Sequence, residues 1–319
     1  MESTMKSLTF AIASSLLAFS LSGTAVQAAE PESCSTVRFS DVGWTDITAT
    51  TAVATEILKG LGYETDIKVL SVPVTYASLS KKDIDVFLGY WKPSMNADLQ
   101  PYLDDKTVET LRTNLVGAKY TLAVPKYTYE AGLKDFKDIA KFKDELDGKI
   151  YGIEPGNDGN RLILDMIKKD AFGLKDFQVV ESSEQGMLAQ VAKEVKREKP
   201  IVFLAWAPHP MNKNFEIEYL SGGDEFFGPD FGGATVGTNV RAGYTAECPN
   251  VGKFLTNLEF SLDMENAIMG KILDDGEEPS KAASDWLKEN PAVLDKWLAG
   301  VTAKDGGDGL AAVKTSLGL

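Results

Sequence analysis

The chain has 319 residues, with 33 Lys and Arg against 47 Asp and Glu, a formal net charge of −14 and one histidine. Hydrophobic residues make up 44% and charged residues 25%, a balance that excludes a disordered chain, a collagen-like repeat and a polytopic membrane protein. The acidic excess also argues against nucleic acid as a partner, because phosphate backbones require a surplus of basic side chains.

The start of the chain has the pattern of a secretory signal. An apolar run over residues 8–21 is shorter than the roughly 20 residues that a membrane-spanning helix requires. Val26 and Ala28 supply small side chains at the −3 and −1 positions, which predicts a signal peptide over residues 1–28, cleaved after Ala28. A retained anchor is the alternative. The remaining chain is then expected to be soluble and exported, in a bacterial periplasm.

Strand and helix patterns alternate through the rest of the chain. Short apolar runs predict strands at residues 36–40, 66–70, 83–91, 119–125, 149–156, 177–182 and 200–206. Helical periodicity predicts helices at residues 47–62, 160–169 and 184–198, with further helices over 251–319. This alternation predicts an α/β fold with mainly parallel sheets.

The length favours two lobes, yet no Pro- or Ser-rich linker separates two halves. Short crossing segments must therefore join the lobes, and residues 116–124 and the glycine-rich residues 228–240 are the candidates. We expect lobe 1 to contain residues 29–118 plus 232–319, and lobe 2 to contain residues 119–231.

The sequence offers little catalytic or metal chemistry. His209 is the one histidine, it lies between two prolines, and no Gly-x-Ser-x-Gly motif supplies a nucleophile for it. A phosphate-binding loop and a Gly-x-Gly-x-x-Gly motif are also absent from the sequence. We therefore expect His209 to be a turn residue with local hydrogen bonds, and we expect no enzyme activity, no cofactor and no metal site.

Two cysteines, Cys34 and Cys248, belong to the predicted exported chain. Cysteine pairs in an oxidising compartment usually form a disulfide. Two free buried thiols are the alternative, because sequence does not show the geometry of the pair.

Aromatic residues mark the ends of several predicted strands. Trp44, Trp91 and Trp206 each follow or end a strand, and Tyr120 begins the strand at the first crossing segment. Ligands of open α/β sheets bind beyond the carboxyl ends of the strands. Aromatic faces attract cations, and a quaternary ammonium, which has no N–H to donate, suits a box of such faces. A tryptophan at the edge of the core is the simpler alternative for each.

Two polar residues accompany these aromatics. Asp46 either caps a helix that begins at Ile47 or lies beside a bound cation, where it accepts a hydroxyl hydrogen bond. Asn157, between a predicted strand and a predicted helix, is either a turn residue or a cleft residue that donates or accepts.

Four strings, "DVGWTD", "GIEPGNDGNRLI", "ESSEQGMLAQVA" and "PHPMN", resemble the glycine betaine/choline class of periplasmic binding proteins of bacterial ABC importers, in its choline-binding form. The resemblance covers essentially the whole chain after the signal. It implies a two-lobed, type II-like fold, each lobe a mainly parallel sheet flanked by helices, with the ligand in the interlobe cleft. The positions that it implies are an aromatic box of Trp44, Trp91, Tyr120 and Trp206, hydroxyl-binding Asp46 and Asn157, and a Cys34–Cys248 disulfide.

The sequence departs from this pattern near the box. Tyr90 stands where the choline-binding pattern has Asn, and Ala205 and Ala207 stand where Gly and Glu are usual. These residues flank the box and can change its shape or its surrounding charge.

Choline is favoured over glycine betaine because a ligand carboxylate requires Arg, Lys or several N–H donors. The segments around the three tryptophans contain no Arg, and Lys119 should point away from the face that Tyr120 uses. Asp46 would repel a carboxylate, whereas Arg161, close to Asn157 in the sequence, keeps betaine open.

The expected function is a monomeric transport protein that captures choline between two lobes and delivers it to the membrane permease of an ABC importer. Acetylcholine or betaine are expected to bind more weakly. A glycine betaine or proline betaine binding protein is the first alternative. Presentation of the ligand to a signalling receptor and an exported choline-ester hydrolase are the others.

Overall fold

The computed structural model describes Met1 and residues 30–319. The predicted signal peptide and its cleavage point therefore lie outside the described residues. Among the helices that are described, none combines the length and the apolar character needed to cross a bilayer.

One nine-stranded sheet runs through the whole molecule. Its strands are β1 (Thr36–Asp41), β2 (Glu64–Val69), β3 (Val86–Lys92), β4 (Val108–Pro125), β5 (Lys149–Tyr151), β6 (Gln178–Val180), β7 (Phe203–Ala207), β8 (Ile217–Tyr219) and β9 (Gly233–Arg241). The order is β2-β1-β3-β9-β4-β7-β5-β6, and β8 also pairs with β4. The long strand β4 is therefore shared by two groups of strands.

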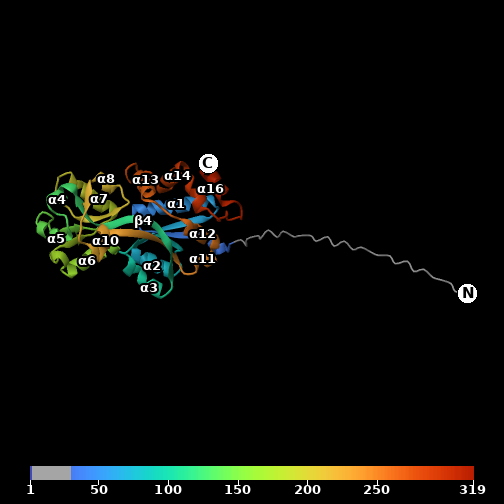
Figure 1. Cartoon of the computed structure of the whole chain (residues 1–319), viewed down its shortest axis with the longest axis horizontal. Helices are drawn as coiled ribbons and strands as arrows, with labels where there is room; N and C mark the ends of the chain where they lie inside the picture. Colours follow the sequence, from blue (N-terminus) through green and yellow to red (C-terminus); the bar gives the residue numbers. More distant parts are fainter. Residues whose placement is uncertain (2–29) are drawn as a thin grey trace.

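Those two groups form the two lobes (Figure 1). Strands β2, β1 and β3 pair in parallel in one lobe, and β7, β5 and β6 pair in parallel in the other. The pairs that β4 and β9 make with each other and with their neighbours are antiparallel. The predicted two-lobed α/β fold is confirmed, and its antiparallel pairs arise because these linking strands pass between the lobes.

Helices cover the sheet on both sides. They are α1 (Thr45–Gly60), α2 (Val72–Ser80), α3 (Asn96–Asp104), α4 (Lys126–Glu130), α5 (Phe136–Ile139), α6 (Asp158–Lys168), α7 (Glu184–Val195), α8 (Met211–Asn214), α9 (Asp224–Phe227), α10 (Pro229–Gly232), α11 (Tyr244–Glu247), α12 (Pro249–Asn257), α13 (Leu262–Leu273), α14 (Pro279–Glu289), α15 (Val293–Trp297) and α16 (Gly309–Leu317). Helices α4 to α8 belong to the lobe at the left of Figure 1, and α1 to α3 with the C-terminal helices belong to the other. The predicted helical tail is thus confirmed.

Strand β4 differs most from its prediction. It begins at Val108, well before the predicted start at residue 119. Its first half is partly exposed, and its register with β9 shifts at several points, so the alternation typical of a strand is lost there. Lys119 of β4 pairs with Gly233 of β9, next to the lobe boundaries at 118/119 and 231/232, which remain our proposal.

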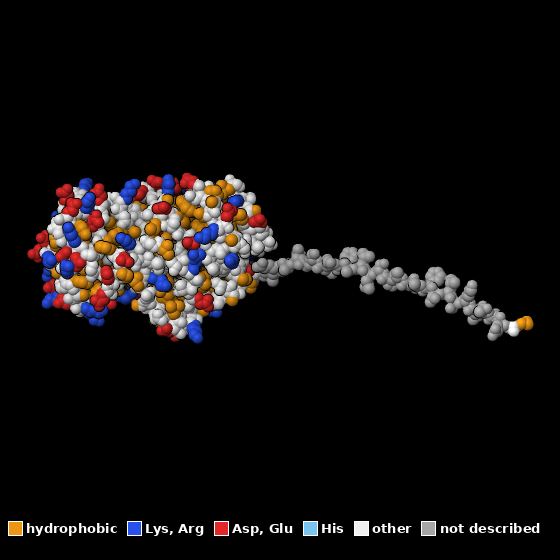
Figure 2. All heavy atoms as spheres, viewed as in Figure 1, with side chains coloured by type: hydrophobic (Ala, Val, Ile, Leu, Met, Phe, Trp, Pro, Cys, Tyr) orange, Lys and Arg blue, Asp and Glu red, His pale blue; other side chains and the backbone are white. Residues whose placement is uncertain are grey.

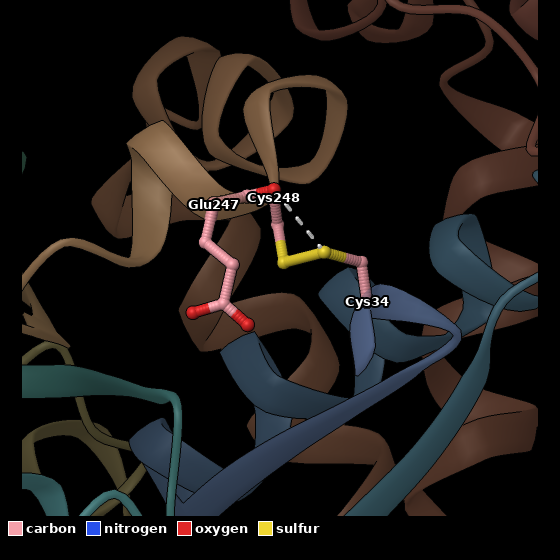
Figure 3. A group of neighbouring side chains, drawn as sticks. All are labelled: Cys34, Glu247 and Cys248. Carbon is pink, nitrogen blue, oxygen red and sulfur yellow. Dashed lines mark hydrogen bonds between the residues drawn. A yellow bond between two sulfur atoms is a disulfide. The ribbon is translucent and has the colours of Figure 1, made fainter. Parts of the chain in front are cut away.

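A disulfide joins Cys34 to Cys248, with the two Cα atoms 5.6 Å apart, as predicted (Figure 3). It ties the segment before β1 to the start of α12, across 214 positions of the chain. Glu247 beside it binds Arg241 at 2.8 Å and accepts from the Ser33 hydroxyl at 2.9 Å. Because the two sulfurs are bonded to each other, this group offers no thiolate to a metal and acts as a structural link.

Acidic and basic side chains are interspersed over the face of the molecule drawn in Figure 2. That face carries no broad region of a single sign, although the whole chain has a net charge of −14. The electrostatics that matter for a ligand are therefore those of the buried site between the lobes.

Candidate ligand-binding site

A small cavity lies between the lobes, where strand ends of both lobes and the start of α1 meet. It is lined by Trp44, Asp46, Trp91, Tyr120, Ile153 and Trp206. Five of the six predicted ligand-binding residues are thus brought together around one space. Ile153 was not predicted, because an isoleucine after a strand is indistinguishable in sequence from an ordinary core residue.

Two rings of the box come from neighbouring strands. Tyr120 of β4 pairs directly with Trp206 of β7, so both side chains stand on the same face of the sheet. Their ring centroids are 6.3 Å apart in an edge-to-face arrangement. Lys119 points the other way, as predicted, with its ammonium over the rings of Tyr219 and Phe231 at 5.5 and 5.6 Å.

The other two rings are oriented by carboxylates. Trp91, near the end of β3, lies 5.8 Å from Tyr120, and its indole N–H donates to Asp46 Oδ2 at 3.1 Å. Trp44 immediately precedes α1, and its indole N–H donates to Glu154 Oε1 of the opposite lobe at 2.9 Å. These hydrogen bonds fix both indole rings beside the cavity.

Asp46 lines the cavity and does not cap a helix. Helix α1 begins at Thr45, two residues earlier than predicted, and no side chain of its own caps it, so the capping alternative is wrong. Asp46 is 1% exposed, and its Oδ1 has no hydrogen-bond partner. Burial, and secondarily the charge of Glu184, raises the pKa of Asp46 from its ordinary value of 3.8 to about 8. The cavity thus contains one buried oxygen, Asp46 Oδ1, that can accept a hydrogen bond from a ligand.

Asn157 caps a helix in this structure. Its Oδ1 accepts from the backbone N–H of Asn160 at 2.8 Å, at the start of α6, and its amide donates to the Glu154 carbonyl. Asn157 is buried but does not line the cavity. Its predicted hydrogen bond to a ligand hydroxyl remains a prediction.

Arg161, the residue that could have bound the carboxylate of glycine betaine, makes its contacts outside the cavity. One of its terminal nitrogens donates to the Ser94 carbonyl and to Asp98 Oδ2, both at 2.8 Å. Ser94 and Asp98 belong to the lobe opposite α6, so Arg161 links the lobes outside the cavity. Within the described part of the chain, no Lys or Arg lines the cavity itself.

Buried acidic groups surround the aromatic rings. Burial raises the pKa of Glu154 to about 7 and that of Asp158 to about 6. It also raises the pKa of Glu265, on α13, well above its usual range, and the charge of Asp46 adds to that effect. A site surrounded by acidic groups favours a bound cation over a bound anion.

Glu184 is a further residue of this region that the sequence analysis missed. It is the first residue of α7, and it accepts hydrogen bonds from Thr45 and His209, which are distant in sequence. No short-range pattern marks such a contact. His209 itself makes the predicted local bond, since its Nδ1 accepts from the Met211 backbone N–H at 3.0 Å.

The three departures from the choline-binding pattern lie beside the box without lining it. Tyr90 precedes Trp91 on β3 and donates its hydroxyl to Asn96 Oδ1 at 2.8 Å. Ala205 and Ala207 flank Trp206 on β7 and so point to the opposite face of the strand. The aromatic walls are therefore intact.

With this geometry established, comparisons define the class of protein. Residues 35–289 match the OpuAC family, the substrate-binding domain of ABC-type glycine betaine transport systems. The chain belongs to this family of ABC transport substrate-binding proteins.

Individual solved structures and a relative in sequence agree with that assignment. An ABC-transporter choline binding protein in complex with choline is 72% identical, has a TM-score of 0.89, and is matched over 90% of this chain and 100% of its own. The structure of an ABC-transporter choline binding protein in an unliganded semi-closed conformation, with the same identity and coverage, has a TM-score of 0.84. The glycine betaine/carnitine transport binding protein GbuC of Listeria monocytogenes is 28% identical over 51% of this chain and 53% of that protein.

Proposed function

We propose that this protein captures choline between its lobes and delivers it to the membrane permease of an ABC importer. The observation that carries this proposal is the lining of the cavity, which consists of four aromatic rings, one isoleucine and one carboxyl, with no basic side chain. A trimethylammonium group has no N–H to donate, and it gains about 0.5 to 2 kcal/mol from each aromatic face that it contacts. The similarity to a choline complex at 72% identity supports the same ligand.

Asp46 supplies a hydrogen-bond acceptor, which a quaternary ammonium group cannot use. Its Oδ2 already accepts from Trp91, and its Oδ1 is buried without a partner. A ligand hydroxyl that donates to Oδ1 satisfies this oxygen, and the nearby positive charge of the ligand favours the ionised carboxylate. Choline carries both a hydroxyl group and a quaternary ammonium group.

Glycine betaine is the second candidate, and two observations favour it. The family takes its description from glycine betaine transport, and two buried donors of the box, the Tyr120 hydroxyl and Trp206 Nε1, have no hydrogen-bond partner. A betaine carboxylate would use such donors but would also approach Asp46 and the acidic groups around it. We therefore place choline ahead of betaine.

We further propose that the protein binds its ligand without chemical change and works after export to the periplasm. The one imidazole near the site uses both ring nitrogens, because His209 accepts from Met211 and contacts Glu184 at 3.2 Å. His209 therefore has a structural role and does not activate a nucleophile. The Cys34–Cys248 disulfide fits an oxidising compartment, which supports export and argues for the predicted signal peptide.

The test is calorimetric titration of the protein, without residues 1–28, with choline and with glycine betaine at one salt concentration. We expect choline to bind in the micromolar range or tighter and betaine to bind more weakly. In the isosteric variant Asp46→Asn we expect choline to lose about tenfold in affinity and betaine to lose less, because a charge-assisted hydrogen bond is worth about 1.5–3 kcal/mol. Tighter binding of betaine by the wild-type protein would contradict the proposal.

A further inference from the structure

Helix α1, which carries Trp44 and Asp46 into the cavity, does not provide its own N-terminal cap. The first N–H groups of a helix have no partner within the helix and require an outside acceptor. The residue at the cap position is Trp44, whose indole nitrogen donates and does not accept. An acceptor for this end of α1 must come from another part of the chain.

Glu184 of the opposite lobe is that acceptor. Its Oε2 accepts from the Thr45 backbone N–H at 2.9 Å, and its Oε1 accepts from the Thr45 hydroxyl at 2.5 Å. Glu184 is the first residue of α7, 139 positions after Thr45. Exposed fractions of 1% for Glu184 and 4% for Thr45 show that this contact is closed to water.

Glu184 is held ready for this contact from within its own lobe. Because His209 Nδ1 accepts from the Met211 backbone, the ring proton is on Nε2, which donates to Glu184 Oε1 at 3.2 Å. The His209 ring also packs edge-to-face against Trp206, with centroids 4.9 Å apart. A continuous set of contacts therefore runs from Trp206, a wall of the box in one lobe, to the start of α1 in the other.

We propose that Glu184 is a positioning residue that caps helix α1 only when the lobes close, and so fixes Trp44 and Asp46 in their ligand-binding arrangement. When the lobes separate, the Thr45 N–H returns to water and Glu184 keeps its partner His209. Binding of the ligand and capping of α1 are thus coupled. This inference rests on the proposed capture of choline between the lobes.

The same contact places the Glu184 carboxylate in the region of Asp46. Capping brings the Glu184 carboxylate close enough to Asp46 for its charge to help raise the pKa of Asp46, so the two acidic groups oppose each other in the closed form. Glu265 of α13 adds a third buried acidic group that interacts with Asp46. A trimethylammonium group in the box offsets this repulsion, whereas a neutral ligand of the same shape does not.

The experiment is a double-mutant cycle on choline affinity, with Glu184→Gln and Thr45→Ala as the single variants. We expect Glu184→Gln to weaken choline binding about tenfold or more, and Thr45→Ala about threefold to tenfold. The loss in the double variant should be smaller than the sum of the two single losses, because Thr45→Ala removes the hydroxyl hydrogen bond that Glu184→Gln already weakens, and leaves the Thr45 backbone N–H in place. The conservative variant Thr45→Ser, which keeps the hydroxyl, should restore affinity to within about twofold of the wild-type value.

A matched control distinguishes the proposed effect of Glu184 on α1 from a general effect of losing a glutamate on α7. Glu194 lies on the same helix and accepts from Gln190 within its own lobe at 2.8 Å. We expect Glu194→Gln to leave choline affinity unchanged. The melting temperature of the ligand-free Thr45→Ala variant should match the wild-type value, whereas its stabilisation by saturating choline should be smaller.

Four outcomes would overturn the inference. Unchanged choline affinity in Glu184→Gln, or additive losses in the double variant, would assign Glu184 to local support of its lobe and leave the proposed function intact. If Glu184→Gln does not fold, Thr45→Ala tests the hydroxyl half of the contact, since it keeps the Thr45 backbone N–H and the Glu184–His209 pair, and wild-type affinity in that variant would contradict the expected threefold to tenfold loss. Failure of the wild-type protein to bind choline would overturn both proposals.

Discussion

Helices α1 and α6 both begin at the cleft, yet their first turns are stabilised in different ways. Helix α6 is capped by its own neighbour, Asn157, whose side chain accepts from the Asn160 N–H. Helix α1 is capped by Glu184, which belongs to the opposite lobe. A local cap is present whenever its helix is folded, whereas a cap from the other lobe is present only when the lobes meet.

This difference distinguishes residues that stabilise one lobe from residues whose contacts form only when the two lobes close. Substitutions at the start of α6 should change stability whether or not ligand is bound. Substitutions that act on the start of α1 should change ligand binding more than they change the stability of the ligand-free protein. The predictions below test this division.

Removing a wall of the box on either side should have the largest effect. Trp91→Ala and Trp206→Ala should each weaken choline binding by about 1 to 3 kcal/mol, through lost cation–π contact and lost apolar burial. Trp91→Ala should be the more damaging, because it also leaves Asp46 Oδ2 without the indole donor that holds it. Calorimetric titration with choline measures both losses.

The control for these variants is Trp286→Ala. Trp286 stacks on Trp297, with centroids 6.4 Å apart, in the C-terminal helices and away from the cavity. Its removal should lower the melting temperature and leave choline affinity unchanged. Wild-type affinity in both box variants would show that the aromatic rings do not bind the ligand.

Gly159→Ala should produce the next largest effect, because it disturbs the box from the α6 side. A Cβ at Gly159 would overlap the Tyr120 hydroxyl and lie 2.8 Å from Leu204 Cδ1. Alanine favours a helix more than glycine does, so any loss arises from displacement of Tyr120 or Leu204 and not from α6 itself. We expect choline affinity to fall about tenfold, within the usual cost of overpacking a core.

A second substitution makes this prediction sharper. Tyr120→Phe removes the hydroxyl that an alanine at position 159 would meet and keeps the aromatic face. The double variant Gly159→Ala/Tyr120→Phe should therefore bind choline more tightly than Gly159→Ala alone, as measured by titration. If it binds no better, the overlap with the hydroxyl is not the cause of the loss.

The comparison of α1 with α6 also explains which features can be predicted from sequence. Trp44, Trp91 and Trp206 were predictable because strand ends are marked locally by turn chemistry, and the carboxyl ends of strands meet at one edge of a sheet. The disulfide followed from two cysteines and an exported chain. Both inferences need only local pattern and general chemistry.

The features that escaped prediction depend on contacts between the lobes. Helix α1 was predicted to start at Ile47, with capping as one of two alternatives for Asp46, but it starts at Thr45, where Glu184 supplies the acceptor. Glu154, which orients Trp44, lies 110 positions away from it and carries no recognisable motif. Such contacts depend on how the two lobes meet, and a local pattern does not contain that information.

Loss of the local cap of α6 should have a moderate effect that does not depend on ligand. Asn157→Ala should destabilise the protein by about 1 kcal/mol, the usual cost of losing a helix cap. Thermal unfolding with and without choline should show the same decrease. The variant Asn157→Asp keeps a capping oxygen and removes the amide donor, so it should keep most of the stability. If Asn157→Asp retains stability but loses choline affinity, Asn157 also contacts the ligand, as the resemblance implies.

The smallest expected effect is a pH dependence from the raised carboxyl pKa values. Asp46 has a pKa of about 8 and Glu154 one of about 7 in the closed form, because burial disfavours their charged states. A bound cation favours ionised Asp46, so choline affinity should rise as the pH increases from 6 to about 8 and then level off. We expect about a threefold rise, limited because opening of the lobes returns Asp46 to water and lowers its pKa.

The stability of the ligand-free protein should show the opposite trend, since a carboxyl with a raised pKa binds more protons in the folded than in the unfolded state. The stability that protonated Asp46 contributes is complete below its ordinary pKa of 3.8 and is lost as the pH rises through about 8. The ligand-free melting temperature should therefore fall only slightly between pH 6 and 8 while choline affinity rises, because only the closed form has the raised pKa. Titrations in buffers of different ionisation enthalpy should detect proton release near pH 7, and Asp46→Asn should reduce it. Equal proton release in that variant would assign the titration to Glu154, whose pKa lies closest to that pH.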